Sequence, residues 1–342
     1  MIISPRAKYL AALAAVTSFT ACETSAPPVK PVSFLDQAAV RAEAVPRISS
    51  FLVWQNDSVL VERYYRSGSA HRTADVKSVS KSFLSALVGI AINEGYMREN
   101  QRVAEILPDY FPPDSDPRKL EITVSDLLSM RSGLQSTSGN AYRAWFAQPD
   151  LTRAALEMPM VAQPGTRMQY STGNSQILSS VLTRVTGVST HEYARRKLAE
   201  PLRIKMPEWP RDATGTFIGG NDMFVSPTAL LRLGITYLNR GKFEGKQIVP
   251  QTWVDQSLRP RGRSPDSQFL YGYGWWLKEA GTHPVFFAWG YGGQFVFCVP
   301  DLRLVAVFTA QLTDDIGDDP QQLAAVHEIV DAVLVPGFAN AH

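Results

Sequence analysis

Ser78-Val79-Ser80-Lys81 opens an apolar stretch, residues 78–94, that has the pattern of a helix and ends near Gly95. Side chains three positions apart share a helix face, so the Ser78 hydroxyl and the Lys81 amine can meet within hydrogen-bond reach. A serine hydroxyl is a weak nucleophile until a base removes its proton. A lysine can be that base where burial disfavours its charged form. The tetrad therefore predicts a nucleophile–base pair at a helix start, where the Ser78 N–H is also available to an oxyanion.

On its own the tetrad is a weak signal, because about one Ser-x-x-Lys is expected by chance in a chain of this length and composition. Ser80 and Ser82 flank it, but neither stands three residues before a lysine. The assignment therefore depends on the rest of the chain. Four further strings follow in order: Leu127-Leu128-Ser129-Met130-Arg131-Ser132-Gly133-Leu134, Pro164-Gly165-Thr166, Tyr170-Ser171-Thr172-Gly173-Asn174 and Trp289-Gly290-Tyr291-Gly292-Gly293-Gln294.

In this order and spacing the strings resemble the serine β-lactamase and penicillin-recognising superfamily. The closest resemblance is to its class C-like esterase and amidase branch, which includes 6-aminohexanoate-dimer hydrolases. The resemblance runs from about residue 50 to about residue 312. The Leu-Leu-Ser-Met-x-Ser-Gly-Leu string is specific to that superfamily, so we do not attribute the match to chance.

The resemblance implies a role for each matching residue. Ser78 matches the acylated serine, and Lys81 matches its base. Tyr170 matches the tyrosine of the family's Tyr-x-Asn motif, whose phenol passes a proton to the leaving group. The stretch Tyr291-Gly292-Gly293 aligns with the third motif, often Lys-Thr-Gly, on a strand that lines the cleft and binds substrate. The backbone N–H of Gln294 would then be the second oxyanion donor.

Two kinds of residue near the expected cleft leave alternatives open. Gly292 and Gly293 either let a substrate carbonyl approach the strand backbone closely or form a bulge or tight turn. Tyr142, Trp145 and Trp209 either line the cleft or belong to the core, which is the commoner place for aromatic side chains in a helical region. Of these three, Trp145 is the predicted substrate-binding residue.

The sequence departs from the family pattern at two positions. Thr172 stands where Tyr-x-Asn has asparagine, and Asn174 lies two residues further on. Tyr291 replaces the lysine that helps to hold a substrate carboxylate in antibiotic-hydrolysing and peptidase members. We therefore expect a serine hydrolase acting on small ester or amide substrates. The alternatives are a penicillin-binding D,D-peptidase or β-lactamase, or a non-catalytic ligand-binding protein on the same fold.

Strand-like runs occur near both ends of the chain, separated by a helical and loop-rich middle. Residues 34–45 and 320–334 have helical patterns, and Asn56-Asp57 indicates a hairpin turn. We therefore expect an α+β, β-lactamase/transpeptidase-like fold over residues 34–342. Its antiparallel sheet would be formed from both chain ends and flanked by helices, with a mostly helical lobe, about residues 96–265, inserted. The predicted strands are Phe51–Trp54, Val59–Tyr65, Tyr271–Leu277, Val285–Trp289, Phe295–Val299 and Leu304–Thr309.

The first residues have the pattern of a secretory signal. Arg6 and Lys8 precede the apolar run Leu10–Val16, which is too short to span a bilayer, and small residues then lead to Cys22. This ending resembles a bacterial lipobox and predicts a signal peptide over residues 1–21, lipidation of Cys22 and a tether over residues 22–33. The expected location is the periplasmic face of a bacterial membrane. The alternative is an ordinary signal peptide with an incidental Cys22.

Composition excludes several other functions. Without residues 1–21 the chain has 32 basic and 32 acidic residues, so no nucleic-acid partner is expected. The five histidines form no His-Glu-x-x-His motif, and no P-loop, dinucleotide fingerprint or Gly-x-Ser-x-Gly elbow occurs. We expect no metal, cofactor or protein partner. Cys298 lies in an apolar run and is expected to be a buried, inert thiol.

Overall fold

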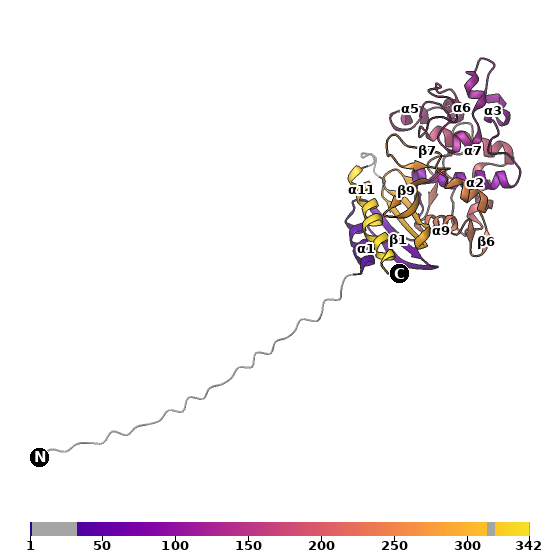
Figure 1. The fold of residues 1–342 in the computed structure, drawn as a ribbon. Helices are drawn as coiled ribbons and strands as arrows, with labels where there is room; N and C mark the ends of the chain where they lie inside the picture. The colour runs from indigo at the N-terminus through magenta and orange to yellow at the C-terminus, as the bar shows by residue number, and fades with distance from the viewer. Residues whose placement is uncertain (2–32, 313–318, 342) are drawn as a thin grey trace. The chain divides into compact units, whose positions relative to one another are not determined.

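The computed structural model describes Met1 and residues 33–312 and 319–341 (Figure 1). Ser33–His342 form one compact unit. Cys22 and residues 2–32 of the predicted signal and tether lie outside the described residues.

An eight-stranded sheet, antiparallel throughout, dominates this unit, with the order β2-β1-β12-β11-β10-β9-β8-β7 (Figure 1). The first two strands precede the helical middle of the chain and the other six follow it, so the prediction of a sheet built from both ends is confirmed. The strands are β1 (Ile48–Gln55), β2 (Ser58–Tyr64), β7 (Gly262–Arg263), β8 (Leu270–Tyr271), β9 (Trp276–Ala280), β10 (His283–Gly290), β11 (Gln294–Val299) and β12 (Leu304–Ala310).

Turn chemistry explains how the edge of the sheet forms. Asn56 and Asp57 join β1 to β2 and both have left-handed backbones, with φ of 46° and 67°. Asparagine and aspartate tolerate this conformation better than most residues, and it matches the twist of a two-residue hairpin. The predicted hairpin is therefore correct.

The predicted strand over residues 271–277 is wrong, because β8 ends at Tyr271 and β9 begins only at Trp276. Gly274 between them has a φ of +76°, which breaks the extended backbone. A Cβ there would lie 2.7 Å from the Lys81 carbonyl oxygen. The break lets the sheet edge approach the helix that carries Lys81.

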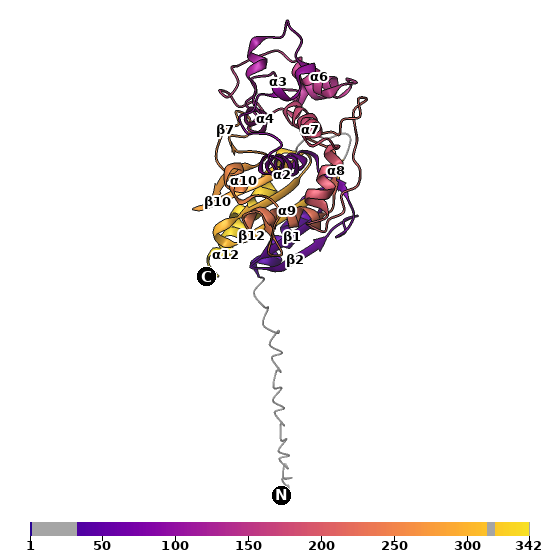
Figure 2. The ribbon, with the colours of Figure 1, turned by 90° about the vertical axis from the view of Figure 1, so that its right-hand side faces the viewer.

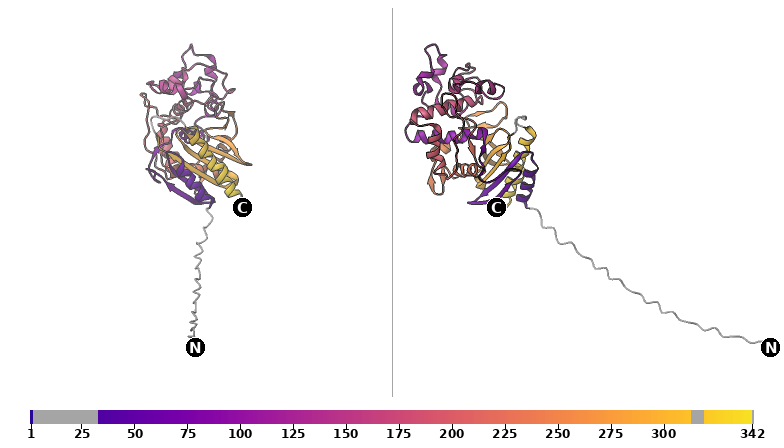
Figure 3. Two further views of the ribbon diagram at one scale, coloured as in Figure 1. Left: turned by 90° about the vertical axis from the view of Figure 1, so that its left-hand side faces the viewer. Right: turned by 180° about the vertical axis from the view of Figure 1, so that it is seen from behind.

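Side chains alternate between two cores on the two faces of the sheet. On β1, Phe51 and Val53 face one core, and Leu52 and Trp54 face the other. Helix α1 (Phe34–Ala44) and the C-terminal helix, α11 (Pro320–Glu328) continuing through η7 (Ile329–Leu334) into α12 (Val335–Ala339), cover the first face (Figure 3). This last helix is long and apolar enough to cross a membrane, but it is partly buried against the sheet.

The opposite face is covered by α2 (Ser80–Asn93) and α9 (Pro227–Leu238), and α2 lies between the sheet and the remaining helices (Figure 2). Residues 94–261, all of them described, contribute no strand to the large sheet. The other α-helices are α3 (Val103–Ile106), α4 (Val124–Leu128), α5 (Tyr142–Phe146), α6 (Leu151–Leu156), α7 (Thr172–Thr186), α8 (Thr190–Ala194) and α10 (Gln251–Ser257). Two small sheets pair β3 (Ala74–Asp75) with β4 (Phe224–Val225) and β5 (Lys242–Phe243) with β6 (Lys246–Gln247).

Candidate active site

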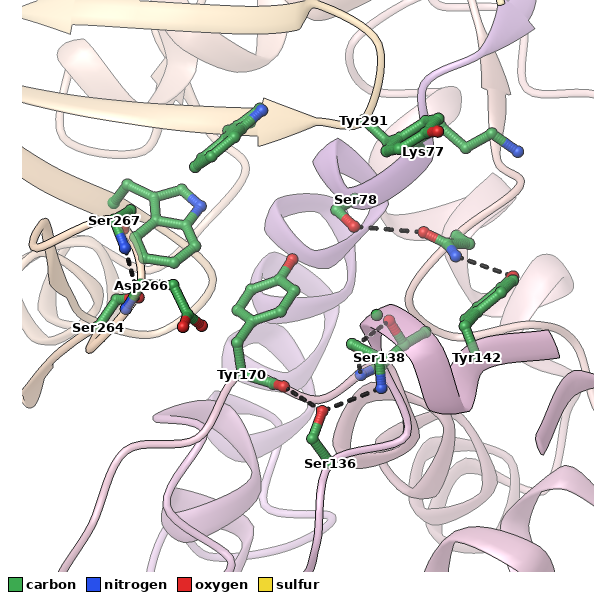
Figure 4. Close-up of a pocket in the computed structure, with 15 residues that line it drawn as sticks. Lys77, Ser78, Ser136, Ser138, Tyr142, Tyr170, Ser264, Asp266, Ser267 and Tyr291 are labelled. Carbon is green, nitrogen blue, oxygen red and sulfur yellow. Dashed lines mark hydrogen bonds between the residues drawn. The ribbon is translucent and has the colours of Figure 1, made fainter. Parts of the chain in front are cut away.

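A pocket of about 700 Å³ opens over the start of α2, between the sheet and the helical segment (Figure 4). Its wall combines aromatic rings with hydroxyl, amide and charged groups, a common composition for a small-molecule site. The lining residues are Lys77, Ser78, Ser136, Ser138, Gly139, Tyr142, Tyr170, Thr172, Asn221, Ser264, Asp266, Ser267, Trp276, Trp289 and Tyr291.

Ser78 lies in the helical turn η1 (Lys77–Val79), which leads directly into α2. Its Oγ accepts a hydrogen bond from Lys81 Nζ at 3.0 Å and donates one to Asn221 Oδ1 at 3.3 Å. Asn221 Nδ2 in turn donates to the Tyr142 hydroxyl at 3.0 Å (Figure 4). The structure therefore brings the predicted serine and lysine together and fixes the serine rotamer from a second side.

Lys81 is buried below the pocket, with 3% of its surface exposed. Its Nζ contacts the carbonyl of Gly220 at 2.7 Å and the Thr172 hydroxyl at 3.3 Å, in addition to Ser78. Burial lowers the pKa of Lys81 to about 7, against a smaller opposing effect of Asp222. A neutral amine has two N–H donors and one lone pair. When the amine is neutral, its two N–H groups can stay on Gly220 and Thr172, and its lone pair can accept the Ser78 proton once that O–H turns from Asn221 to Nζ.

Tyr170 lies beside this pair, in the segment that leads into α7. Its ring stacks on Trp276 at 5.4 Å between centroids and meets Tyr271 edge-on at 6.0 Å. The Lys81 amine lies 5.0 Å from the centre of the same ring. The hydroxyl points toward the side of the pocket where Ser78 lies (Figure 4). The ring is therefore held by packing while its hydroxyl is directed to the reaction site.

The structure shows which residue takes the place of the asparagine in the Tyr-x-Asn motif. Thr172, at the asparagine position, contacts Lys81 directly, and its hydroxyl is also 3.0 Å from that of Ser138. Asn174 points elsewhere: its Oδ1 accepts from Ser132 at 2.9 Å, and its Nδ2 contacts the Met130 sulfur. Thr172 rather than Asn174 therefore occupies the position beside Lys81.

Trp145 does not line the pocket, so that prediction is wrong. Only 4% of its surface is exposed, and its indole N–H donates to the Leu151 carbonyl at 3.0 Å. Tyr142, on the same short helix α5, lines the pocket instead and packs on Phe146. The helix has only five residues, so the sequence pattern could not show which of its faces is buried.

The glycines of the third motif form a turn, which is the second of the two alternatives raised above. Gly292 and Gly293 join β10 to β11 with φ of +80° and +102°, and the Gly292 carbonyl accepts from Gln322 at 2.9 Å. Gln294 is fully buried at the start of β11, where its amide exchanges two hydrogen bonds with the Ala310 backbone, at 2.9 and 3.1 Å. Of these predicted residues, Tyr291 alone lines the pocket.

Sequence reasoning missed Asn221 and Lys77. Gly219-Gly220-Asn221-Asp222 has the composition of a turn, which was the available signal. Nothing local shows that this turn meets Ser78, which is 143 positions away. Among the described residues no group of three or more His, Cys, Asp or Glu side chains is arranged to hold a metal ion.

Comparisons with known proteins agree with this geometry. The sequence model of the Beta-lactamase family matches residues 47–331. A 6-aminohexanoate-dimer hydrolase from Paenarthrobacter ureafaciens is 27% identical over 259 residues, which cover 68% of this chain and 64% of that protein. The chain thus spans less than two thirds of that relative's length.

Solved structures share the fold. The structure titled "EstCE1, a hydrolase with promiscuous acyltransferase activity" has a TM-score of 0.71 at 18% identity, covering 87% of this chain and 100% of the other. A putative 6-aminohexanoate-dimer hydrolase from Bacillus anthracis has a TM-score of 0.68 at 18% identity, covering 86% and 80%. At these identities the likeness shows the fold alone, and it confirms the β-lactamase/transpeptidase-like class predicted above.

Proposed function

Because the chain belongs to the beta-lactamase family of hydrolases, we propose that it cleaves ester or amide bonds through an acyl-enzyme on Ser78. One observation carries this proposal. The Ser78 Oγ lies 3.0 Å from the amine of a buried lysine, and the other contacts of that amine, Gly220 and Thr172, can take its two N–H groups when it is neutral. A base with a pKa of about 7 is suited to proton transfer at neutral pH.

In acylation, Lys81 accepts the Ser78 proton as Oγ attacks the substrate carbonyl carbon. The carbonyl π bond opens to an oxyanion. The oxyanion then re-forms the carbonyl as the bond to the leaving group breaks. Tyr170 gives its proton to the departing oxygen or nitrogen and regains one from the Lys81 ammonium. Water attacks the acyl-enzyme in the second half, with the same groups moving the protons in reverse order.

The oxyanion needs two backbone donors, and the buried Gln294 is poorly placed to be one. We assign the N–H groups of Ser78 and Tyr291. Gly290, which precedes Tyr291, lies so close to the Ser78 segment that a Cβ there would be 2.2 Å from the Val76 carbonyl oxygen. Tyr291, the residue after the end of β10, lines the pocket just beyond this contact.

The charges around the pocket support uncharged acyl groups as substrates. Among the described residues that line it, Lys77 is the one cation, and its ammonium is shared by Asp75 and Asp222. To pair with Lys77, a substrate carboxylate would have to displace the carboxylate of Asp75 or Asp222. Together with Tyr291 at the usual lysine position, this favours simple esters and amides over penicillins and over D,D-peptidase substrates.

Labelling with a fluorophosphonate probe tests the nucleophile. We expect intact-mass analysis to show one adduct, and peptide mapping to place it on Ser78. Ser78→Ala should abolish the adduct and the hydrolysis of p-nitrophenyl butyrate. Ser267→Ala is a matched control, because Ser267 lines the same pocket without a lysine partner, and it should label as the unmodified protein does. An adduct on Ser80 or Ser82, or none on a folded protein, would refute the proposal.

We also propose that the protein is exported and anchored by a lipid on Cys22, on the strength of its N-terminal sequence alone. Cells grown with an alkyne-tagged palmitate should yield a labelled protein that partitions with membranes. Cys22→Ala should abolish the label, whereas Cys298→Ala, a change at a buried thiol, should leave it. Palmitate label on the Cys22→Ala protein would show that the lipid is attached to another residue.

A further inference from the structure

Lys77, the residue before the nucleophile, has an uncommon backbone. Its φ is +49°, a left-handed conformation that residues with a side chain rarely adopt. Such conformations persist where surrounding contacts over-determine them, and they concentrate at functional sites. Asp222, which follows the Asn221 that accepts from Ser78, is also left-handed, with a φ of +62°.

Ionic contacts hold these two backbones together. The Lys77 N–H donates to Asp75 Oδ1 at 2.8 Å, and its ammonium pairs with Asp75 and donates to Asp222 Oδ1 at 3.1 Å. Pairing of β3 with β4 brings the two carboxylates to the same place, since Asp75 lies opposite Phe224. The carboxylates shield most of the lysine side chain, of which 27% is exposed.

The same contacts tie the nucleophile segment to the segment that orients both reactive atoms. Asp222 directly follows Gly220, which binds the Lys81 amine, and Asn221, which accepts from Ser78. The Val76 N–H donates to the Met223 carbonyl at 3.0 Å on the other side. A change at Lys77 is therefore transmitted to Ser78 and to Lys81 through one short stretch of backbone.

We propose that Lys77 is a positioning residue. Bridged between Asp75 and Asp222, it fixes the left-handed backbone that presents the Ser78 hydroxyl to Lys81, and it neutralises the Asp222 carboxylate. This inference rests on the proposed function, because it concerns how Ser78 and Lys81 are held for reaction.

The proposal has an electrostatic consequence with a definite sign. The titratable and charged groups around Lys81 are Tyr170 before α7, Tyr271 on β8 behind it, Asp222 before β4, and Lys77 and Asp75 behind Asp222. Asp222 raises the pKa of Lys81 against the effect of burial. The Lys77 ammonium offsets that carboxylate, so removing Lys77 should raise the pKa of Lys81, and removing Asp222 should lower it.

The test measures kcat/KM for p-nitrophenyl butyrate between about pH 5 and pH 9 in the full-length protein. In Lys77→Met the acid limb should move up by about one pH unit, the typical spread of lysine pKa values in proteins. In Asp222→Asn it should move down. Lys246→Met, a change at an exposed lysine on β6, is the control and should match the unmodified protein.

Lys77→Gly separates the backbone from the charge. Glycine adopts a positive φ at no steric cost. This variant should therefore share the shifted acid limb of Lys77→Met but retain a higher rate on the plateau at high pH. It also provides the test if Lys77→Met does not fold, which circular dichroism would show.

Two results would overturn the inference. The charge effect would be excluded if the acid limb stayed in place in the Lys77 variants and in Asp222→Asn. It would also be excluded if the acid limb moved in the same direction in the Lys77 variants as in Asp222→Asn. Equal plateaus for the glycine and methionine variants would exclude the backbone effect. Failure of the proposed function would give a different result. Hydrolysis would then survive Ser78→Ala in the unmodified protein and in the Lys77 and Asp222 variants alike.

Discussion

In the proposed mechanism, the protonation state of the Lys81 amine sets the pH range in which Ser78 can react. A lysine with the ordinary pKa of 10.5 would be neutral in only about one molecule in 3,000 at pH 7, whereas Lys81, with a pKa of about 7, is neutral in about half. Only the neutral amine can accept the serine proton. We therefore expect kcat/KM to be level above about pH 8 and to fall about tenfold for each pH unit below pH 7.

The assay is initial-rate hydrolysis of p-nitrophenyl butyrate, followed at the isosbestic wavelength of nitrophenol so that its own ionisation does not distort the profile. The Ser78→Ala protein provides the blank at each pH. Asp75 is a competing source of an acid limb, because burial and the neighbouring Asp222 raise its pKa to about 6 despite the opposing Lys77. Asp75→Asn removes that group, and an acid limb near pH 7 should remain.

A profile that is flat down to about pH 5, or one whose midpoint lies above about pH 9, would refute this reasoning. The first result would mean that Lys81 is not the base. The second would mean that the amine is hydrated, so that its burial in the static structure does not persist in solution.

Three other predictions concern single substitutions. Tyr170→Phe should lower kcat at least about tenfold without loss of folding, since acid–base steps contribute about 10²–10⁴-fold; an unchanged kcat would remove Tyr170 from the mechanism. Tyr291→Lys should raise nitrocefin hydrolysis relative to butyrate hydrolysis, by up to one or two decades if a charge-assisted contact worth about 1.5–3 kcal/mol forms. Ordinary β-lactamase rates in the unmodified protein would contradict this. Lys81→Met should abolish turnover yet raise the free energy of unfolding at pH 7, because methionine has a similar length without the cost of burying an amine. The unfolded state binds more protons than the folded state between pH 7 and pH 10.5, so this gain should be full below pH 7 and should fade towards pH 10.5; a less stable variant at pH 7 would contradict it.

The sheet and the serine–lysine pair were predictable because their signals are local. Runs of β-branched and aromatic residues indicate strands wherever they pair, and an i, i+3 pair at a helix start brings its side chains together by helix geometry alone. The Asn56-Asp57 turn is local in the same way, because the conformation it needs is an intrinsic preference of those residues.

The errors occurred where burial is decided by a distant segment. Gly274 interrupts a run that has the composition of one strand, because the backbone there must approach α2. The backbone N–H of Gln294 was predicted as an oxyanion donor from its position after two glycines, and that position could not show that the residue is fully buried with its side-chain amide bonded to Ala310 on the neighbouring strand. Asn221 could not be found at all, because its importance arises from a contact that only the folded chain makes.

The base itself depends on two parts of the fold that approach it from opposite directions. A Cβ on Gly220, from the helical segment, would lie 3.1 Å from the Lys81 amine, and a Cβ on Gly274, from the edge of the sheet, would lie 2.7 Å from the Lys81 carbonyl oxygen. Because these two residues have no side chain, their backbone packs directly against Lys81. A side chain at either position would hold the backbone away from Lys81 and leave room for water. Since desolvation is what lowers the pKa of Lys81, we infer that the amine can act as the proposed base at neutral pH only when both backbones are in place. The proposed reactivity of Ser78 is therefore a property of the assembled unit rather than of the Ser-x-x-Lys helix.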